Sequence, residues 1–318
     1  MQRTGEILKF SPHKAKNSLL TFDLRRAFIL RKRHNSFVSS DIVHIIKLLD
    51  DPDPSVQVAI EGFLEQFDGN ISEHIVGEAI SLTKAQRTQL SGYLLPGRKK
   101  VLQDNWFVPN RFQLADSRDV DSLEYLLSLL SDFLHDGITL RPSLADSLDQ
   151  LLDEVHTAGA GDSVSDLVKF LFKSGQFTGN RARYFSKDNS DLVWVLNHST
   201  GNPISLVAIL ILIAHRLDLE VEGCNYPGHF LAWVPNGDKP YLLDPFNRGR
   251  ILSPQQIMRD NSGISERAKK ALSGPCALRS VVVRTLNNIE TSMLKGHFTS
   301  DIELMKQLKG SLSSVSSA

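Results

Sequence analysis

The chain has few cysteines. Its 318 residues include only Cys224 and Cys276. Two cysteines supply neither a disulfide framework nor the clustered thiolates of a structural zinc site. Sparse cysteine also suits a reducing cytosol. We therefore expect a cytoplasmic protein that holds no metal and no other cofactor.

Net charge and long apolar runs are missing as well. Lys and Arg together equal Asp and Glu, so the formal net charge is zero, which argues against a nucleic-acid partner held by bulk electrostatics. The most apolar run, Leu206–Ala214, has about nine residues, whereas a membrane span needs about 18–20. Met1–Phe10 lacks the apolar centre of a signal peptide. We expect no nucleic-acid partner and no membrane span.

The first part of the chain has helical periodicity. Apolar side chains in Ile42–Leu49 and Val56–Leu64 recur at i, i+3 and i+4, and the sequence DDPDP between these runs separates two helices. This pattern predicts a hairpin of the HEAT-repeat kind within a helical region, residues 1–98. The segment LLPGRKK, Leu94–Lys100, combines Pro, Gly and a charge run, and it predicts a linker to a core at residues 99–260.

The pattern changes twice after this linker. Amphipathic helices give way to a long polar segment, residues 174–201, which is typical of a loop that lines a site. From Leu219 onward, short strand-like runs alternate with turn residues and predict a small antiparallel sheet packed on a helix near Pro203. Residues 261–318 predict a closing helical pair and a disordered tail. The fold class we expect is α+β.

One hairpin brings a histidine and an aspartate together. Asn236-Gly237 is a strong two-residue turn signal, and a turn centred there places His229 directly opposite Asp244 on one face. The carboxylate could then hold one imidazole nitrogen and leave the other free as a base. The alternative is a structural pair that stabilises the end of the sheet.

A helix start lies in the neighbouring segment. In GNPISLVAILILIAHRL, Asn202 fits the N-cap and Pro203 the first helical position. Free N–H groups and the positive end of the helix dipole favour an anion or a thiolate there. A His–Asp pair that faces a helix N-terminus is the arrangement of a Cys-His-Asp acyl-transfer site.

Five stretches carry a family resemblance, over roughly residues 120 to 295. They resemble the transglutaminase-like superfamily, a papain-like cysteine fold, and above all its SirB-type bacterial branch, which is also similar to a domain of a eukaryotic F-box protein. The stretches are FTGNRARYFSKDNSDLVWVL, GNPISLVAILILIAHRLDLEVEG, YPGHFLAWV, LLDPFNRGRIL and VVVRTLNNI. The resemblance implies a papain/transglutaminase-like core, with His229 and Asp244 at the His and Asp positions of the triad.

The nucleophile position departs from that triad. The resemblance places the catalytic Cys at Pro203, which has no nucleophile, and the SirB-type branch reads Asn-Pro-Ile-Ser at the same place. Ser205 could substitute, although its side chain lies about 200° around the helix from Pro203; otherwise it satisfies backbone groups. Cys224 could approach His229 from the sheet, or be an ordinary buried strand cysteine. His198 fits a loop histidine.

Several polar side chains are candidate binding residues. An arginine in the polar segment or in DPFNRGR could bind a carboxylate or phosphate as a fork, and the same groups could instead tie the loop to the sheet. Such a cleft would suit an acidic ligand or a peptide segment. The candidates are Arg181, Arg183, Tyr184, Asn189, Asn202, Arg248 and Arg250.

Three functions remain open at this point. The first is a non-catalytic binding or regulatory protein, a pseudoenzyme that keeps the His–Asp pair and cleft without the Cys and has a protein or peptide partner. The second is an unconventional serine hydrolase, acyltransferase or protease-like enzyme that uses Ser205, His229 and Asp244. The third is a structural adaptor whose own loop fills the cleft.

Overall fold

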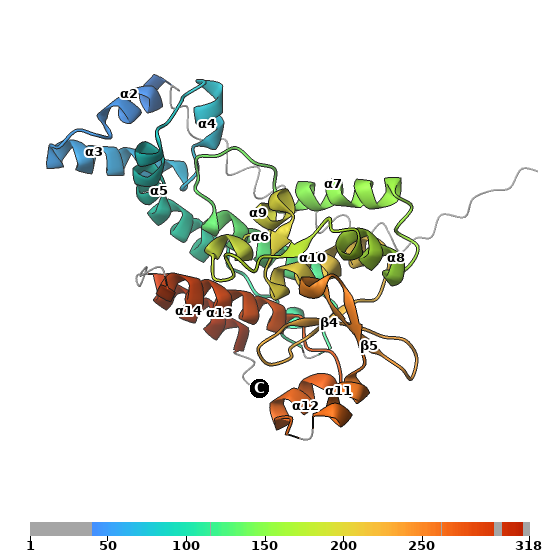
Figure 1. Cartoon of the computed structure of the whole chain (residues 1–318). Coiled ribbons are helices and arrows are strands. Elements are labelled where there is room, and N and C mark those ends of the chain that lie inside the picture. Colours follow the sequence, from blue (N-terminus) through green and yellow to red (C-terminus); the bar gives the residue numbers. More distant parts are fainter. Residues whose placement is uncertain (1–39, 115, 262, 296–300, 314–318) are drawn as a thin grey trace, which may run out of the picture.

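The computed structural model describes residues 40–114, 116–261, 263–295 and 301–313. Figure 1 shows an extension of N-terminal helices, a central helical layer with a small sheet beneath it, and a pair of C-terminal helices at the side. The helices predicted before residue 40 and the tail predicted after Ser313 lie outside the described residues.

The N-terminal extension is helical, as predicted. Asp53 caps α3 by accepting a hydrogen bond from the Ser55 amide at 2.8 Å, and Pro54 occupies the first turn. Ile42, Ile60 and Leu90 lie in a hydrophobic cluster of this region. The elements are α2 (Ser40–Leu48), α3 (Pro54–Leu64), η1 (Glu65–Phe67), α4 (Ser72–Gly77) and α5 (Lys84–Asn105).

The linker prediction is wrong, because Leu94–Lys100 lies inside α5. A capping box between Thr83 and Gln86 starts this helix, and Pro96 is accommodated within it. Leu94 belongs to the N-terminal hydrophobic cluster and Leu102 to the central one, so a single helix enters both cores. The division of the chain at residue 98 stays a prediction.

Arg98 of α5 joins the two regions. Its guanidinium donates to the carbonyl oxygens of Asp136 at 3.0 Å, Ser91 at 3.1 Å and Gly69 at 3.3 Å. Burial lowers the pKa of Arg98 to about 10. Gly97 permits the approach, because a Cβ there would lie 2.4 Å from the Gly69 nitrogen. The charge run that suggested a linker therefore contains a buried structural arginine.

The central layer is built around α10, which is buried from Pro203 to Ala214. Among the described residues, no helix combines the length and the apolar character that crossing a membrane requires. The central elements are η2 (Asn110–Gln113), α6 (Val120–Leu134), α7 (Leu144–Thr157), α8 (Val164–Val168), the π-helical turn η3 (Lys169–Lys173), η4 (Lys187–Ser190), α9 (Leu192–His198) and α10 (Pro203–Arg216).

Two small sheets position the site. A parallel pair, β1 (Thr178–Gly179) with β2 (Thr200–Gly201), closes the polar segment and leads directly into α10. The second sheet is antiparallel, in the order β3-β4-β5-β6. Its strands are β3 (Glu222–Cys224), β4 (Leu231–Val234), β5 (Tyr241–Asp244) and β6 (Arg250–Leu252), and the short helix η5 (Pro245–Asn247) follows β5.

C-terminal helices cover the rest of the core. Leu272 of α12 packs with Leu231, Trp233 and Leu242 on one face of the antiparallel sheet. The closing pair is present as predicted and packs together beside the core (Figure 1). These helices are α11 (Pro254–Asp260), α12 (Glu266–Leu272), α13 (Arg279–Lys295) and α14 (Ile302–Ser313). The α+β fold class is confirmed.

Candidate functional site

His229 and Asp244 meet, although through a different register from the predicted one. His229 Nε2 lies 2.8 Å from Asp244 Oδ1. Ala232 pairs with Leu243, which places Leu231 level with Asp244 and leaves His229 in the turn before β4. The direct cross-strand pairing was therefore wrong by two residues. A shift of two keeps each side chain on its face of a strand, so the histidine still reaches the carboxylate diagonally.

Asp244 is held in its charged form. The carboxylate accepts hydrogen bonds from the Asn247 backbone amide at 3.1 Å and from Asn247 Nδ2 at 2.6 Å, besides the bond from His229. Burial raises the pKa of Asp244, but the hydrogen bonds from His229 and Asn247 outweigh it, and the pKa lies below its ordinary value. An ionised carboxylate only accepts, so Nε2 carries the proton.

The other imidazole nitrogen is available. The described residues give His229 Nδ1 no hydrogen-bond partner, and the side chain is 29% exposed. With Nε2 protonated and bound to Asp244, a neutral ring presents Nδ1 as an acceptor. His229 Nδ1 can therefore accept a hydrogen bond, or a proton, from a group that enters from solvent.

Phe246 is the centre of the site. The His229 ring meets it edge-on, with centroids 5.9 Å apart, and the Tyr184 ring does the same at 5.8 Å. The Arg181 guanidinium lies over the Phe246 ring, 5.1 Å from its centroid. Gly179 makes room for Phe246, since a Cβ there would lie 2.6 Å from the ring and 2.7 Å from the backbone oxygen. Phe246 thus connects the polar segment to the His–Asp pair.

Arg181 also acts through Asn247. Its guanidinium donates to Asn247 Oδ1, and the amide nitrogen of the same side chain donates to Asp244. The predicted binding arginine is therefore a positioning residue for the His–Asp pair in this structure. No role for Asn247 was predicted from the sequence. Its position in DPFN, three residues after Asp244, was the sequence feature that could have indicated a contact with Asp244.

The helix start has the predicted cap. Asn202 is the N-cap of α10 and its side chain accepts a hydrogen bond from the Ser205 amide at 2.9 Å, with Pro203 in the first turn. Ser205 Oγ donates to the Asn202 carbonyl at 3.0 Å, and Ser205 is only 2% exposed. No hydrogen bond joins Ser205 to His229 in the described part of the chain. Asn202 and Ser205 close the helix end internally.

The remaining candidates of the polar segment divide into two groups. Arg183 is exposed and pairs with Asp188 at 3.2 Å. Asn189 is fully buried and bonds Asn180 Nδ2 and the carbonyls of Arg183 and Tyr184, so its amide ties the segment together. Tyr184 remains 38% exposed beside Phe246.

Arg248 and Arg250 follow the C-terminal end of η5. Both are exposed, and Arg250 pairs with Asp244 through the backbone of β6. The structure gives neither guanidinium an ion pair with a described residue. Of the seven candidate binding residues, four are exposed and have no ion pair with a described residue: Arg181, Tyr184, Arg248 and Arg250.

Cys224, the other nucleophile candidate, and His198, the expected loop histidine, lie outside the site. Cys224 Sγ donates to the Ala271 carbonyl at 3.2 Å, within the apolar layer under α12, and burial raises its pKa to about 12. The His198 ring stacks on Trp194 and its Nδ1 contacts the Trp194 carbonyl. Neither contacts His229. Within the described residues, no cluster of metal-ligand side chains is present.

Two comparisons relate the chain to known proteins. Residues 143–287 match the transglutaminase-like superfamily model. More particularly, the chain is similar to a UPF0162 protein of Xylella fastidiosa, with 35% identity over 129 residues, and to Protein SirB1 of Salmonella typhimurium, with 28% identity over 140 residues. It is also similar to the F-box only protein 21 of Mus musculus, with 27% identity over 135 residues.

These similarities cover parts of each protein. They involve 39%, 43% and 40% of this chain, and 46%, 50% and 21% of the Xylella, Salmonella and mouse proteins, respectively. The chain thus spans half or less of the length of these curated relatives. No solved structure matches the chain. The SirB-type and F-box resemblance inferred from the sequence is confirmed.

Proposed function

We propose that this chain is a non-catalytic transglutaminase-like protein with a binding or regulatory role. The observation that carries the proposal is the start of α10: Pro203 occupies its first turn at the position that the resemblance gives to the nucleophile. Acyl transfer at such a site needs a thiolate or alkoxide beside the imidazole. A triad that lacks one member retains only about 10³–10⁴-fold of rate over water.

The contacts of Ser205 count against the serine alternative. Its hydroxyl is buried and bonds the preceding turn of its own helix rather than His229. A nucleophile must lie within hydrogen-bond reach of its base, and apo geometry is at most somewhat longer. Acyl transfer or amide hydrolysis through Ser205 would therefore require the first turn of α10 to rearrange.

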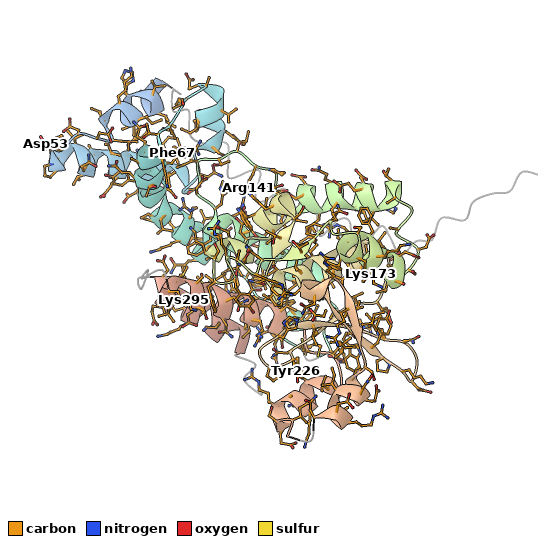
Figure 2. All side chains as sticks on the ribbon, viewed as in Figure 1. Asp53, Phe67, Arg141, Lys173, Tyr226 and Lys295 are labelled. Atoms are coloured by element: carbon orange, nitrogen blue, oxygen red, sulfur yellow. The ribbon has the colours of Figure 1, made fainter. Side chains whose placement is uncertain are left out.

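A protein or peptide partner suits the surface around His229. Tyr184 and Phe185 are 38% and 50% exposed and stack edge-on, and aromatic side chains that stay exposed are frequent in binding surfaces. Lys295, labelled in Figure 2, lies over the Phe185 ring and adds positive charge there. The resemblance to an F-box protein agrees with a protein partner. We also infer a cytoplasmic location, because Cys224 and Cys276 are free.

Active-site labelling tests the proposal. The purified chain is incubated with a fluorophosphonate probe and, separately, with a fluorescent primary amine and a glutamine-containing protein. We expect no labelling of Ser205 and no amine incorporation above buffer. Labelling at Ser205 that disappears in both Ser205→Ala and His229→Ala would replace the proposal with the serine mechanism. Ser199→Ala, which changes a serine before β2, is the matched control.

A further inference from the structure

Four ring side chains contact one another in a row that ends at the His–Asp pair. Phe185 meets Tyr184 edge-on, with ring centroids 5.1 Å apart, and Tyr184 meets Phe246 in the same way at 5.8 Å. Phe246 in turn meets the His229 ring at 5.9 Å. Phe185 and Tyr184 are exposed, the His229 side chain is 29% exposed, and Phe246 is buried. We call these four side chains the aromatic row.

Two cations lie over rings of the aromatic row. Lys295 Nζ lies 3.0 Å from the centroid of Phe185, and the Arg181 guanidinium lies 5.1 Å from the centroid of Phe246. Both cationic side chains are exposed, and neither has an ion pair with a described residue. A ring attracts a cation but does not neutralise its charge. The row therefore combines exposed apolar area with two positive charges that no described acid balances.

The acids of the neighbouring elements are engaged by other groups. Asp188, in the polar segment, pairs with Arg183 at 3.2 Å. Glu290, on α13, pairs with Lys309 of α14. Asp244 is buried, and its carboxylate already accepts three hydrogen bonds. An acidic ligand would therefore supply the charge that complements the two cations.

The open nitrogen of His229 indicates which acidic ligand fits. His229 Nε2 donates to Asp244, so Nδ1 of the neutral ring can only accept and needs an N–H or O–H donor. The backbone of a peptide supplies N–H donors, whereas an ionised phosphate backbone supplies acceptors alone. An acidic peptide thus satisfies both the cations and the imidazole acceptor.

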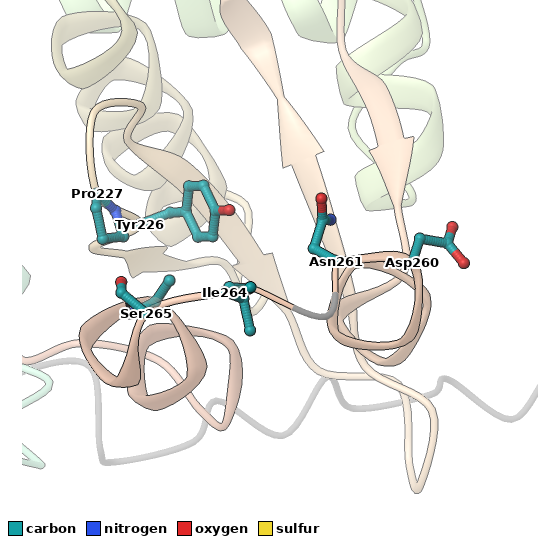
Figure 3. Close-up of a pocket in the computed structure, with 8 residues that line it drawn as sticks. Tyr226, Pro227, Asp260, Asn261, Ile264 and Ser265 are labelled. Carbon is teal, nitrogen blue, oxygen red and sulfur yellow. Dashed lines mark hydrogen bonds between the residues drawn. The ribbon is translucent and has the colours of Figure 1, made fainter.

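The cavity beside the same turn has the opposite character. It has a volume of about 520 Å³ and lies between α12 and the turn that leads to His229. Figure 3 shows Tyr226 and Pro227 of this turn at one end of the cavity and Asp260 at the other. Among the described residues that line the cavity, Asp260 alone is charged, and its carboxylate repels an acidic ligand. The cavity is therefore not the place for an acidic peptide.

We propose that the aromatic row is the docking surface for an extended, acidic peptide segment of a partner protein. This inference rests on the proposed binding function and names the chemistry of the partner. Carboxylates of the segment pair with Lys295 and Arg181, and its apolar atoms cover Phe185 and Tyr184. A backbone N–H of the segment donates to His229 Nδ1. The ring-to-ring distances of 5.1, 5.8 and 5.9 Å correspond to about five residues of extended peptide, at about 3.3 Å per residue.

Matched heptapeptides test this surface. A panel of random heptapeptides is synthesised with Glu, Gln or Lys at positions 2 and 5, and binding to the purified full chain is measured by fluorescence polarisation. We expect each Glu version that binds to do so about tenfold more tightly than its Gln partner, because charge-assisted hydrogen bonds are stronger than neutral ones.

Single variants locate the bound peptide. Lys295→Gln should remove most of the preference for Glu over Gln, whereas Phe185→Ala and His229→Ala should weaken both versions, because they remove no charge from the row. Lys295 and Phe185 are exposed, so their variants should keep the wild-type melting temperature. Arg259→Gln, in α11, and Phe107→Ala, between α5 and η2, are the matched controls, since both side chains are exposed outside the row.

The outcomes separate the docking surface from the function. Peptide binding that Lys295→Gln and Phe185→Ala leave unchanged overturns the docking surface and leaves the binding function intact. Preferential binding of the Lys versions, lost in Asp260→Asn, assigns the peptide to the cavity and also overturns the surface. An oligouridylate that binds more tightly than the Glu peptides, and depends on Phe185, overturns the peptide assignment. Binding of no peptide overturns the surface, whereas the non-catalytic function fails separately, on labelling of Ser205.

Discussion

At the scale of single residues, Asn247 supports the charged form of Asp244 together with His229. This exposed side chain receives a hydrogen bond from Arg181 and donates one to Asp244, so it transmits the position of the polar segment to the carboxylate. Asn247 orients the Asp244 carboxylate, and the carboxylate in turn orients the His229 ring. Supporting hydrogen bonds of this kind hold the ligating or reacting group of many sites in place.

Asn247→Ala should raise the pKa of Asp244 toward its ordinary value of 3.8, because the variant keeps the backbone donor and loses the amide donor. The lowered pKa stabilises the fold above the unfolded pKa, and that contribution is lost as the pH falls through the folded value. Acid unfolding should therefore begin at a higher pH in the variant. Carboxyl-carbon NMR titration measures the pKa directly. Asn236→Ala in the hairpin turn is the control, and an unchanged Asp244 titration would contradict the role assigned to Asn247.

Single residues also show what the sequence could predict. The His229–Asp244 pair was predictable, because both residues flank one hairpin with a strong turn signal. The roles of Phe246 and Asn247 were not, because they come from contacts with the polar segment, which is distant in the chain. Asn189 was a candidate binding residue because asparagine often binds ligands. Its burial and its bond with Asn180 show that it supports the polar segment instead.

At the scale of elements, the first turn of α10 contains Pro203, which carries no nucleophile. Asn202 caps α10 and keeps that role whatever residue follows. The helix dipole at this end favours a negative charge. We therefore infer that this end of α10 would stabilise a thiolate placed at residue 203.

Pro203→Cys should produce a thiol whose alkylation by iodoacetamide has a pH midpoint below the ordinary value of about 8.5, because the helix N-terminus stabilises the thiolate. Adding His229→Ala should raise that midpoint. Background labelling should be slow, since burial raises the pKa of Cys224 to about 12 and of Cys276 to about 11. Ser205→Cys, at a buried position of the same helix, is the matched control. A midpoint at or above 8.5 in Pro203→Cys would refute this view of the helix start.

Two elements show why local patterns failed. The turn signal at Asn236-Gly237 was real, since Gly237 has a positive φ of 51°, but the loop from Pro235 to Pro240 is longer than a two-residue turn. Loop length sets register, and the prolines determine that length. In α5, Pro96 and Gly97 have the composition of a linker. The close approach of Gly97 to Gly69 and the hydrogen bond from Arg98 to the Gly69 carbonyl stabilise the helix despite this composition.

At the scale of the whole molecule, the N-terminal helices are joined to the core through the end of α6. His135 caps α6 and its Nδ1 accepts a hydrogen bond from the Gly137 amide at 3.2 Å. The Gly137 carbonyl in turn accepts from the Ile71 amide at 2.8 Å, next to α4. Arg141, labelled between the two regions in Figure 2, bonds Asp191 at 2.6 Å nearby. The junction is therefore polar and includes a titratable group.

This junction should weaken in mild acid. Burial, and next the charge of Arg141, lower the pKa of His135 from 6.5 to about 4. The unfolded chain then binds its proton first, so stability should fall as the pH drops from 6.5 toward 4, by about 1.4 kcal/mol per unit of pKa difference. His135→Asn, which keeps an acceptor that does not titrate, should lose that pH dependence. Urea unfolding across the window measures it, with His156→Asn as the control for loss of an imidazole. Parallel wild-type and His135→Asn curves would contradict the prediction.

The continuity of α5 has a mechanical consequence. Its 22 residues make a rod of about 33 Å that is anchored by Leu94 in one core and by Leu102 in the other. A rod fixed at both ends transmits torque, so a partner that rotates the N-terminal helices must also strain the core around α6, or break the helix near Pro96. Fragments cut at residue 98 would sever this rod and separate the carbonyls of Gly69 and Ser91 from those of Phe133 and Asp136, all of which Arg98 binds. Fragments meant to isolate residues 143–287, which match the transglutaminase-like superfamily model, should therefore keep α5 whole.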